Sequence, residues 1–179
     1  MATRKLLLAL LLLLAILPGA SSAQSWFERT GINAFFGASP STQDFVRQMA
    51  LGEMFETELA RLANERGGEK TKAFAEQILK DHRETTAHIK ALVQGGRVKV
   101  ALPTALDAAQ LDTLARLRAM SPADFDREFE ALQLSLHQQA ISLFERYGAG
   151  GDHPDLKQFA YRHLPHLREH WRLAQSLTR

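Results

Sequence analysis

Four polar residues stand at positions where an amphipathic helix normally turns apolar side chains toward a core. Glu56, His82 and His170 each interrupt an apolar repeat of three- and four-residue steps, and His137 is flanked at helical spacing by leucine, alanine and phenylalanine. A carboxylate or an imidazole buried between helices needs a partner, because an unpaired polar group away from water is costly. The pattern therefore predicts a polar cluster inside a helical core.

Two kinds of structure would satisfy such a cluster. Three imidazoles and one carboxylate form a ligand set for Zn, Mn, Fe or Cu, so a divalent transition metal is the candidate cofactor. The candidate ligands are Glu56, His82, His137 and His170. Alternatively, Glu56 accepts hydrogen bonds from one or two of the histidines in a buried network without a metal. The sequence leaves both interpretations open.

Three neighbouring positions bear on this cluster. Gly52 lies one helical turn before Glu56, where the lack of a side chain is expected to leave room for an imidazole from another helix. His166 stands four residues before His170, a spacing that can chelate a metal. His163 also falls in the apolar repeat of its segment, but we interpret His163 and His166 as surface residues near a helix end.

Four long helices are predicted to carry the candidate ligands. Their start signals are a Ser41 N-cap, a first residue near Glu69, a Ser121–Pro122 pair and Pro154. Glycine pairs at 67–68 and 95–96 are predicted to end the first two helices, and residues 148–151 are predicted to form a turn. Each candidate ligand then falls a little past the middle of its helix, so the four can lie at similar heights.

The connection over residues 97–121 sets the topology. It contains an extended stretch, a Leu102–Pro103 pair and a predicted short helix from about Asp107 to Ala119. A hairpin between antiparallel helices needs only a few residues, whereas a segment of this length can travel the length of a bundle. We expect an all-α, ferritin-like four-helix bundle over residues 41–179, with a long crossover and with the second and third long helices parallel.

The first 23 residues have the pattern of a cleavable secretory signal. Arg4 and Lys5 precede an apolar run over 6–17, and small residues lead to Ala23. A run of about a dozen residues is shorter than the roughly 20 that span a membrane as a helix. We therefore predict cleavage after Ala23, a mature chain without a transmembrane anchor, and location in the periplasm or cell envelope.

Residues 24–40 are predicted to form an irregular arm. Trp26, Phe27, Phe35 and Phe36 lie there among small and polar residues. Such an arm packs on the bundle or contacts a membrane surface or an envelope protein. The sequence leaves these choices open.

Composition and motifs exclude several function classes. Two of the 22 basic residues and none of the 20 acidic residues lie in the signal, so the remaining chain is balanced in charge and gives no support to nucleic-acid binding. There is no cysteine, no nucleophile elbow, no phosphate-binding glycine loop and no zinc-protease motif. We assign no catalytic residue and do not predict an enzyme.

A set of motifs in this order resembles a family of exported bacterial proteins known as domain of unknown function 4142, often labelled outer-membrane or exported proteins. The motifs are the segment from Phe45 through Ala63, Phe74–Ala75 with Asp81–His82, Leu102–Pro103, Phe125–Asp126, His137, and Phe159–Ala160 with Leu164–Pro165 and His170. The resemblance covers roughly residues 41–177. It implies a ferritin-like helical bundle and brings no established activity.

One departure from di-iron proteins of the ferritin type limits the expected chemistry. Those proteins carry a Glu-x-x-His pair on each of two helices. In this chain the residue three positions before each candidate histidine is a leucine, namely Leu79, Leu134 and Leu167. We therefore expect no di-iron oxidase or iron-storage role. Two function classes remain: a metal-binding exported bundle, and a non-catalytic envelope or stress-related interaction protein with a metal-free polar network.

Overall fold

A computed structural model describes residues 37–177 as helices and connecting loops, without a strand in that range. The predicted signal over 1–23 and most of the predicted arm over 24–40 lie outside the described residues. The helices are α3 (Thr42–Arg66), α4 (Glu69–Gln94), α5 (Ala108–Arg118), α6 (Pro122–Gly150) and α7 (Pro154–Ala174). None of these five helices is long and apolar enough to cross a membrane.

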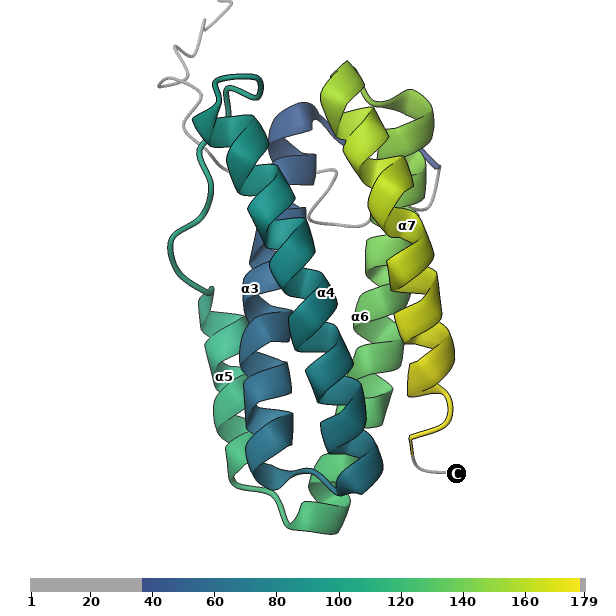
Figure 1. Cartoon of the computed structure of the whole chain (residues 1–179). Helices are drawn as coiled ribbons and strands as arrows, with labels where there is room; N and C mark the ends of the chain where they lie inside the picture. Colours follow the sequence, from purple (N-terminus) through teal and green to yellow (C-terminus); the bar gives the residue numbers. More distant parts are fainter. Residues whose placement is uncertain (1–36, 178–179) are drawn as a thin grey trace, which may run out of the picture.

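The long helices form two hairpins that pack side by side (Figure 1). Helix α3 packs on α4 and α6 packs on α7, and the hairpins meet through α3 against α6 and α4 against α7. The segment after α4 returns along the outside of the bundle, and α5 within it packs against α3 and α6. Consequently α4 and α6 run in the same direction, which confirms the ferritin-like crossover.

Short side chains define where the helices begin. The hydroxyl of Ser41 accepts a hydrogen bond from the Asp44 amide at 3.1 Å, and Ser121 does the same for Asp124 at 3.3 Å. Asp107 starts α5 with a reciprocal capping box, in which its carboxylate pairs with the Gln110 amide at 2.9 Å. Each cap satisfies an amide that has no partner inside its helix, which is why these starts can be read from sequence.

The predicted turn over 148–151 is wrong. Helix α6 continues through Gly150 and ends at Gly151, whose amide donates to the carbonyl of Tyr147. The glycines here serve close packing: a Cβ on Gly148 would lie 3.2 Å from the Tyr161 ring of α7. The glycine at position 148 is therefore explained by the close approach of α7, and it does not end α6.

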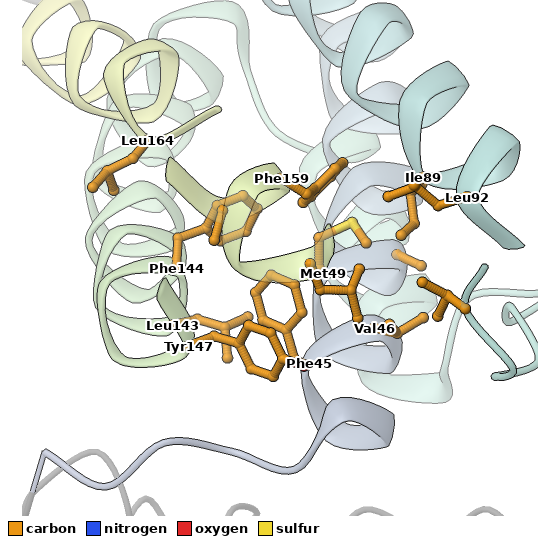
Figure 2. Packing of buried hydrophobic residues seen from close by; sticks show 14 of the residues in the cluster. Phe45, Val46, Met49, Ile89, Leu92, Leu143, Phe144, Tyr147, Phe159 and Leu164 are labelled. Carbon is orange, nitrogen blue, oxygen red and sulfur yellow. The ribbon is translucent and has the colours of Figure 1, made fainter. Parts of the chain in front are cut away.

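Two apolar clusters fill the bundle, one toward each end. Figure 2 shows the cluster built around Phe45, Met49, Phe144, Tyr147 and Phe159, where the Phe45 and Tyr147 rings stack at 4.1 Å between centroids. The second cluster contains buried apolar residues from further along α3, from the first half of α4 and from the start of α6, including Phe55, Leu59, Phe74, Ile78 and Phe129. A buried polar layer lies between the two clusters, and its residues come from all four long helices.

Candidate metal centre

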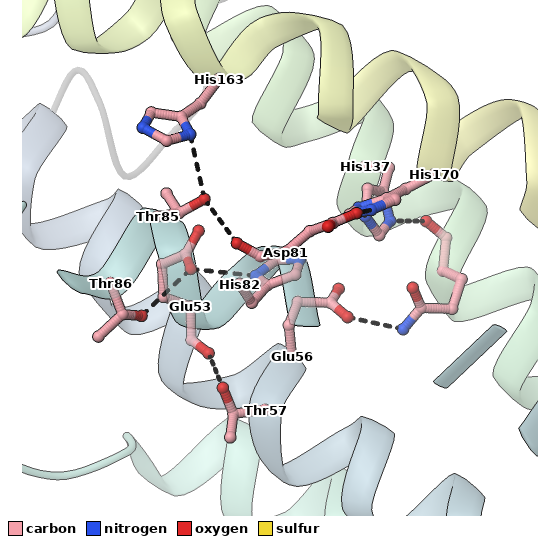
Figure 3. A network of polar contacts seen from close by, with 11 residues as sticks. Glu53, Glu56, Thr57, Asp81, His82, Thr85, Thr86, His137, His163 and His170 are labelled. Carbon is pink, nitrogen blue, oxygen red and sulfur yellow. Dashed lines mark hydrogen bonds and ion pairs between the residues drawn. The ribbon is translucent and has the colours of Figure 1, made fainter. Parts of the chain in front are cut away.

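Three buried histidines converge in the polar layer. His82 comes from α4, His137 from α6 and His170 from α7, and one ring nitrogen of each lies within 4.8 Å of the other two (Figure 3). Nε2 of His137 and Nδ1 of His170 are 3.3 Å apart. Helix α3 supplies no histidine to this group; it contributes two buried carboxylates, Glu53 and Glu56. The sequence prediction that these histidines face the core is confirmed.

The tautomer of His137 follows from its backbone contact. Its Nδ1 lies 3.0 Å from the carbonyl oxygen of Gln133, which can only accept, so Nδ1 carries the proton. Burial lowers the pKa of His137, so the ring is neutral at physiological pH. The lone pair of the ring therefore lies on Nε2, the nitrogen that faces His170.

His170 is oriented in the same way by a carboxylate. Its Nε2 donates to Oδ2 of Asp81 at 2.9 Å, and Gln77 also donates to that oxygen at 2.6 Å. Burial lowers the pKa of His170 to about 4 despite this hydrogen bond. Neutral His170 therefore has its lone pair on Nδ1. Two lone pairs then face each other across 3.3 Å, an arrangement that calls for a proton or a cation between them.

His82 differs from the other two imidazoles in its charge. Its Nδ1 lies 3.1 Å from Oε2 of Glu53, and its buried Nε2 has no hydrogen-bond partner among the described residues. Burial alone would lower the pKa of His82, but the charges of Glu53, Glu56 and Asp81 together raise it to about 9. Without a metal this ring is a cation at neutral pH.

The spacing of two of the three nitrogens suits a small cation, and the nitrogen of His82 lies within 4.8 Å of both. Tetrahedral ligands at about 2.0 to 2.1 Å from Zn²⁺ stand roughly 3.3 to 3.4 Å apart. The separation of His137 and His170 already has this value, at 3.3 Å. In metal sites the second nitrogen of a histidine ligand is usually held by a carboxylate or a backbone carbonyl. All three rings here meet that condition through Glu53, Gln133 and Asp81.

Glu56 lies in the polar layer, as the sequence predicts, but the structure gives it a different neighbour from the one expected. Its Oε2 accepts a hydrogen bond from Nε2 of Gln133 at 2.8 Å, while its Oε1 is buried without a partner among the described residues. It does not belong to the compact group of three histidines. The carboxylates bonded to histidines are Glu53 and Asp81 instead, which corrects the expected Glu56–histidine network.

The sequence did not identify Glu53, Asp81 or Gln133 as hydrogen-bond partners in this layer, although Asp81 stands in one of the family motifs. Glu53 stands three residues before Glu56 and Gln133 four before His137, so helical spacing places each on the same face as a residue that had been identified. That spacing could have revealed them. Asp81 gives no such signal, because it adjoins His82 on α4 but bonds to a histidine of α7.

Two expectations about neighbouring residues are wrong. A Cβ on Gly52 would meet nothing within 4 Å, so no imidazole fills the space beside it. His163 is buried rather than on the surface, because α7 packs there against Thr85 and His88 of α4: Nδ1 of His163 lies 3.3 Å from the Thr85 hydroxyl and Nε2 lies 2.9 Å from Nδ1 of His88. His166 is half-buried.

Comparison with known proteins places the chain in a family without naming an activity. No curated protein and no solved structure matches it significantly. The family model described as "Domain of unknown function (DUF4142)" matches residues 31–177, a range that includes all five described helices and every residue of the polar layer. The chain therefore belongs to the DUF4142 family.

Proposed function

We propose that this chain is an exported bundle protein that binds a divalent transition metal through His82, His137 and His170. The observation that carries the proposal is the common orientation of the three rings. Each ring has one nitrogen directed at an oxygen acceptor, so its other nitrogen is free to bind a cation. A metal between them would remove the conflict between the facing lone pairs of His137 and His170.

The charges around the site favour a cation. Glu53, Glu56 and Asp81 surround the three imidazoles, and Glu53 and Glu56 are buried. His82 carries a proton in the absence of metal, so a metal would replace that proton and add charge where three carboxylates are available to balance it. The nitrogen-rich ligand set suits Zn, Cu, Fe or Mn, and buffering or sensing such a metal is the role we assign.

Location in the periplasm or cell envelope is part of the same proposal. It rests on the order of charged, apolar and small residues over 1–23. Mass spectrometry of the protein from a cell-envelope fraction is expected to find a new N-terminus at Gln24. Recovery of the chain from the cytosol with residues 1–23 intact would exclude export.

A second candidate function is a non-catalytic envelope or stress-related interaction protein whose polar layer is structural. The hydrogen bonds of the layer favour it, because those of His82 with Glu53 and of His170 with Asp81 already satisfy much of the layer without a metal. On this alternative the arm over 24–40 contacts an envelope protein or a membrane surface. The partner would then be bound outside the bundle core.

Elemental analysis of the natively purified protein distinguishes the two candidates. The metal proposal predicts close to one transition-metal ion per chain in the wild type and none in His137→Ala. The matched control is His166→Ala, which changes a half-buried histidine on α7 that does not belong to the group of three. Equal metal content in all three proteins, or no metal in any of them after supplementation, would leave the structural alternative.

A further inference from the structure

A pocket lies beside the three-histidine site and is lined by two of its histidines. It has a volume of about 610 Å³, and both Glu56 of α3 and His137 of α6 line it, together with His82. Gly52 lines the same pocket one turn before Glu56. A metal held by the three histidines would therefore have one side toward a space large enough for several water-sized molecules.

Gly52 keeps this pocket open at a cost to its helix. Glycine inside a helix is about 1 kcal/mol less favourable than alanine. No packing contact explains it, since a Cβ at this position would meet nothing within 4 Å. The effect of the glycine is to leave free the part of the pocket that lies next to Glu56.

Two buried oxygen atoms beside the histidines lack donors among the described residues. They are Oε1 of Glu56 and Oε1 of Gln133, and the two side chains are joined through the remaining atoms of each, Gln133 Nε2 donating to Glu56 Oε2 at 2.8 Å. Glu56 is 5 % exposed and Gln133 is 0 % exposed, so bulk solvent does not satisfy these acceptors. They call for a donor that reaches them from inside the site.

Three protein ligands leave one position of a tetrahedral metal open, which is the arrangement of reactive zinc sites rather than of structural ones. Water at that position is a donor of two hydrogen bonds. An anion there would add to the charge of three nearby carboxylates, so a neutral ligand is favoured.

The geometry points to an open coordination position on the metal, directed into this pocket, that holds an exchangeable water molecule. Glu56 accepts a hydrogen bond from that water and is not itself a metal ligand. The pocket beside Gly52 provides the route by which water, or another small neutral donor, reaches the metal. This inference rests on the proposed metal binding and specifies which small molecules the metal can contact.

Relaxation of water protons by bound Mn²⁺ tests the open position, because only water that exchanges on the metal is relaxed strongly. The Mn²⁺-loaded wild type is expected to show this enhancement. Gly52→Leu fills the pocket and should remove it, while Gly52→Ala, whose methyl group fits the open space, should retain it. Ala140→Leu, which enters the same pocket from α6, should act like Gly52→Leu. Azide should leave the enhancement unchanged.

The outcomes separate this inference from the proposal beneath it. Equilibrium dialysis measures Mn²⁺ binding to each protein first. If the wild type binds no Mn²⁺, Zn²⁺ or Co²⁺, the proposed function fails and the open position fails with it. If Mn²⁺ binds but relaxes water no more than a saturated complex does, or if Gly52→Leu relaxes water as the wild type does, metal binding stands and the open position is refuted. Displacement of the water by azide would refute its preference for a neutral ligand.

A separate experiment tests whether Glu56 binds the metal or only accepts a hydrogen bond from the bound water. In the Co²⁺-loaded protein the visible absorption bands report the atoms bound to the metal. Glu56→Gln should keep the wild-type band positions, because the ligand set is unchanged, whereas His137→Gln should shift them or abolish binding. A shift in Glu56→Gln as large as that in His137→Gln would show that Glu56 is a ligand and would overturn its assignment as the acceptor of the water proton.

Discussion

Two groups of histidines lie in the same bundle, and their nitrogens are used in opposite ways. In the group of His82, His137 and His170, an oxygen acceptor holds one nitrogen of each ring, and the other nitrogens converge. In the pair of His88 and His163, the nitrogens bond to each other at 2.9 Å. Burial alone therefore does not leave a histidine nitrogen available to a metal.

Hydrogen bonds within the protein use the nitrogens through which His163 could bind a metal. The hydroxyl of Thr85 donates to the backbone carbonyl of Asp81 at 3.2 Å, so its oxygen accepts from Nδ1 of His163. Nε2 of His163 then accepts from Nδ1 of His88. Both nitrogens of His163 are used within the protein. What decides the chemistry of a buried imidazole is the group that holds its second nitrogen.

The largest expected effect is a difference in Zn²⁺ affinity between a variant in the group of three histidines and a variant in the pair. His137→Ala removes a ligand and should weaken Zn²⁺ binding by more than the 10- to 100-fold typical of outer-shell changes. His163→Ala is the matched control and should leave affinity unchanged. Isothermal titration calorimetry with Zn²⁺ measures both. Equal losses in the two variants would show that the groups do not differ as described.

Removing an oxygen acceptor tests the cause of the difference. Asp81→Asn keeps the size of the side chain but weakens the hold on Nε2 of His170, so affinity for Zn²⁺ should fall by roughly 10- to 100-fold. Glu84→Gln, an exposed change on the same helix, should have no effect. An unchanged affinity in Asp81→Asn would mean that the orientation of His170 does not depend on the carboxylate.

The metal-free protein should be most stable near pH 6.5. The pKa of His82 is raised to about 9, so its contribution is complete below the ordinary value of 6.5 and is lost as the pH rises toward 9. The pKa values of His163 and His170 are lowered to about 4, so stability also falls as the pH drops from 6.5 toward 4. Urea denaturation across this range should show both limbs. His82→Gln should remove the alkaline limb and also weaken the acid limb, because the charge of His82 helps to lower the pKa of His163 and His170. A wild-type profile without the alkaline limb would contradict the charge assigned to His82.

The smallest expected effect concerns the stability of the pair. His163→Ala leaves Nδ1 of His88 without its acceptor and the Thr85 hydroxyl without its donor. In the absence of metal, this should lower the free energy of unfolding by about 1 to 3 kcal/mol. His166→Ala changes a half-buried neighbour and should fall within about 0.5 kcal/mol of the wild type. Urea denaturation measures both, and an equal cost in the two variants would show that the hydrogen-bonded pair contributes nothing.

Helical periodicity predicted that His82, His137 and His170 are buried, because the apolar pattern within a single helix shows which of its faces points to the core. Capping residues indicated the starts of α3, α5 and α6, where Ser41, Asp107 and Ser121 accept hydrogen bonds from nearby backbone amides. The crossover followed from the length of residues 97–121, since the chain must travel the bundle to join the next helix. These features depend on short stretches of sequence and could be read from them.

The features that the sequence did not reveal depend on contacts between helices. Asp81 adjoins His82 in sequence but accepts a hydrogen bond from His170, because of how α4 packs on α7. His163 is buried by the same packing, and the ring of Tyr161 on α7 leaves little room for a side chain at Gly148 within α6. The cleavage after Ala23 stays a prediction, and so do the possible contacts of the arm over 24–40.

The melting temperature with and without metal tests the central claim most directly. A ligand at a hundred times its dissociation constant stabilises the folded state by about 2.7 kcal/mol. For a domain of this size that corresponds to a rise of roughly 5 to 10 °C. Zn²⁺ or Mn²⁺ should raise the melting temperature of the wild type by this amount, a chelator should reverse the rise, and His137→Ala should show none. Melting curves that respond to no first-row divalent metal, in wild type and His137→Ala alike, would contradict the metal site.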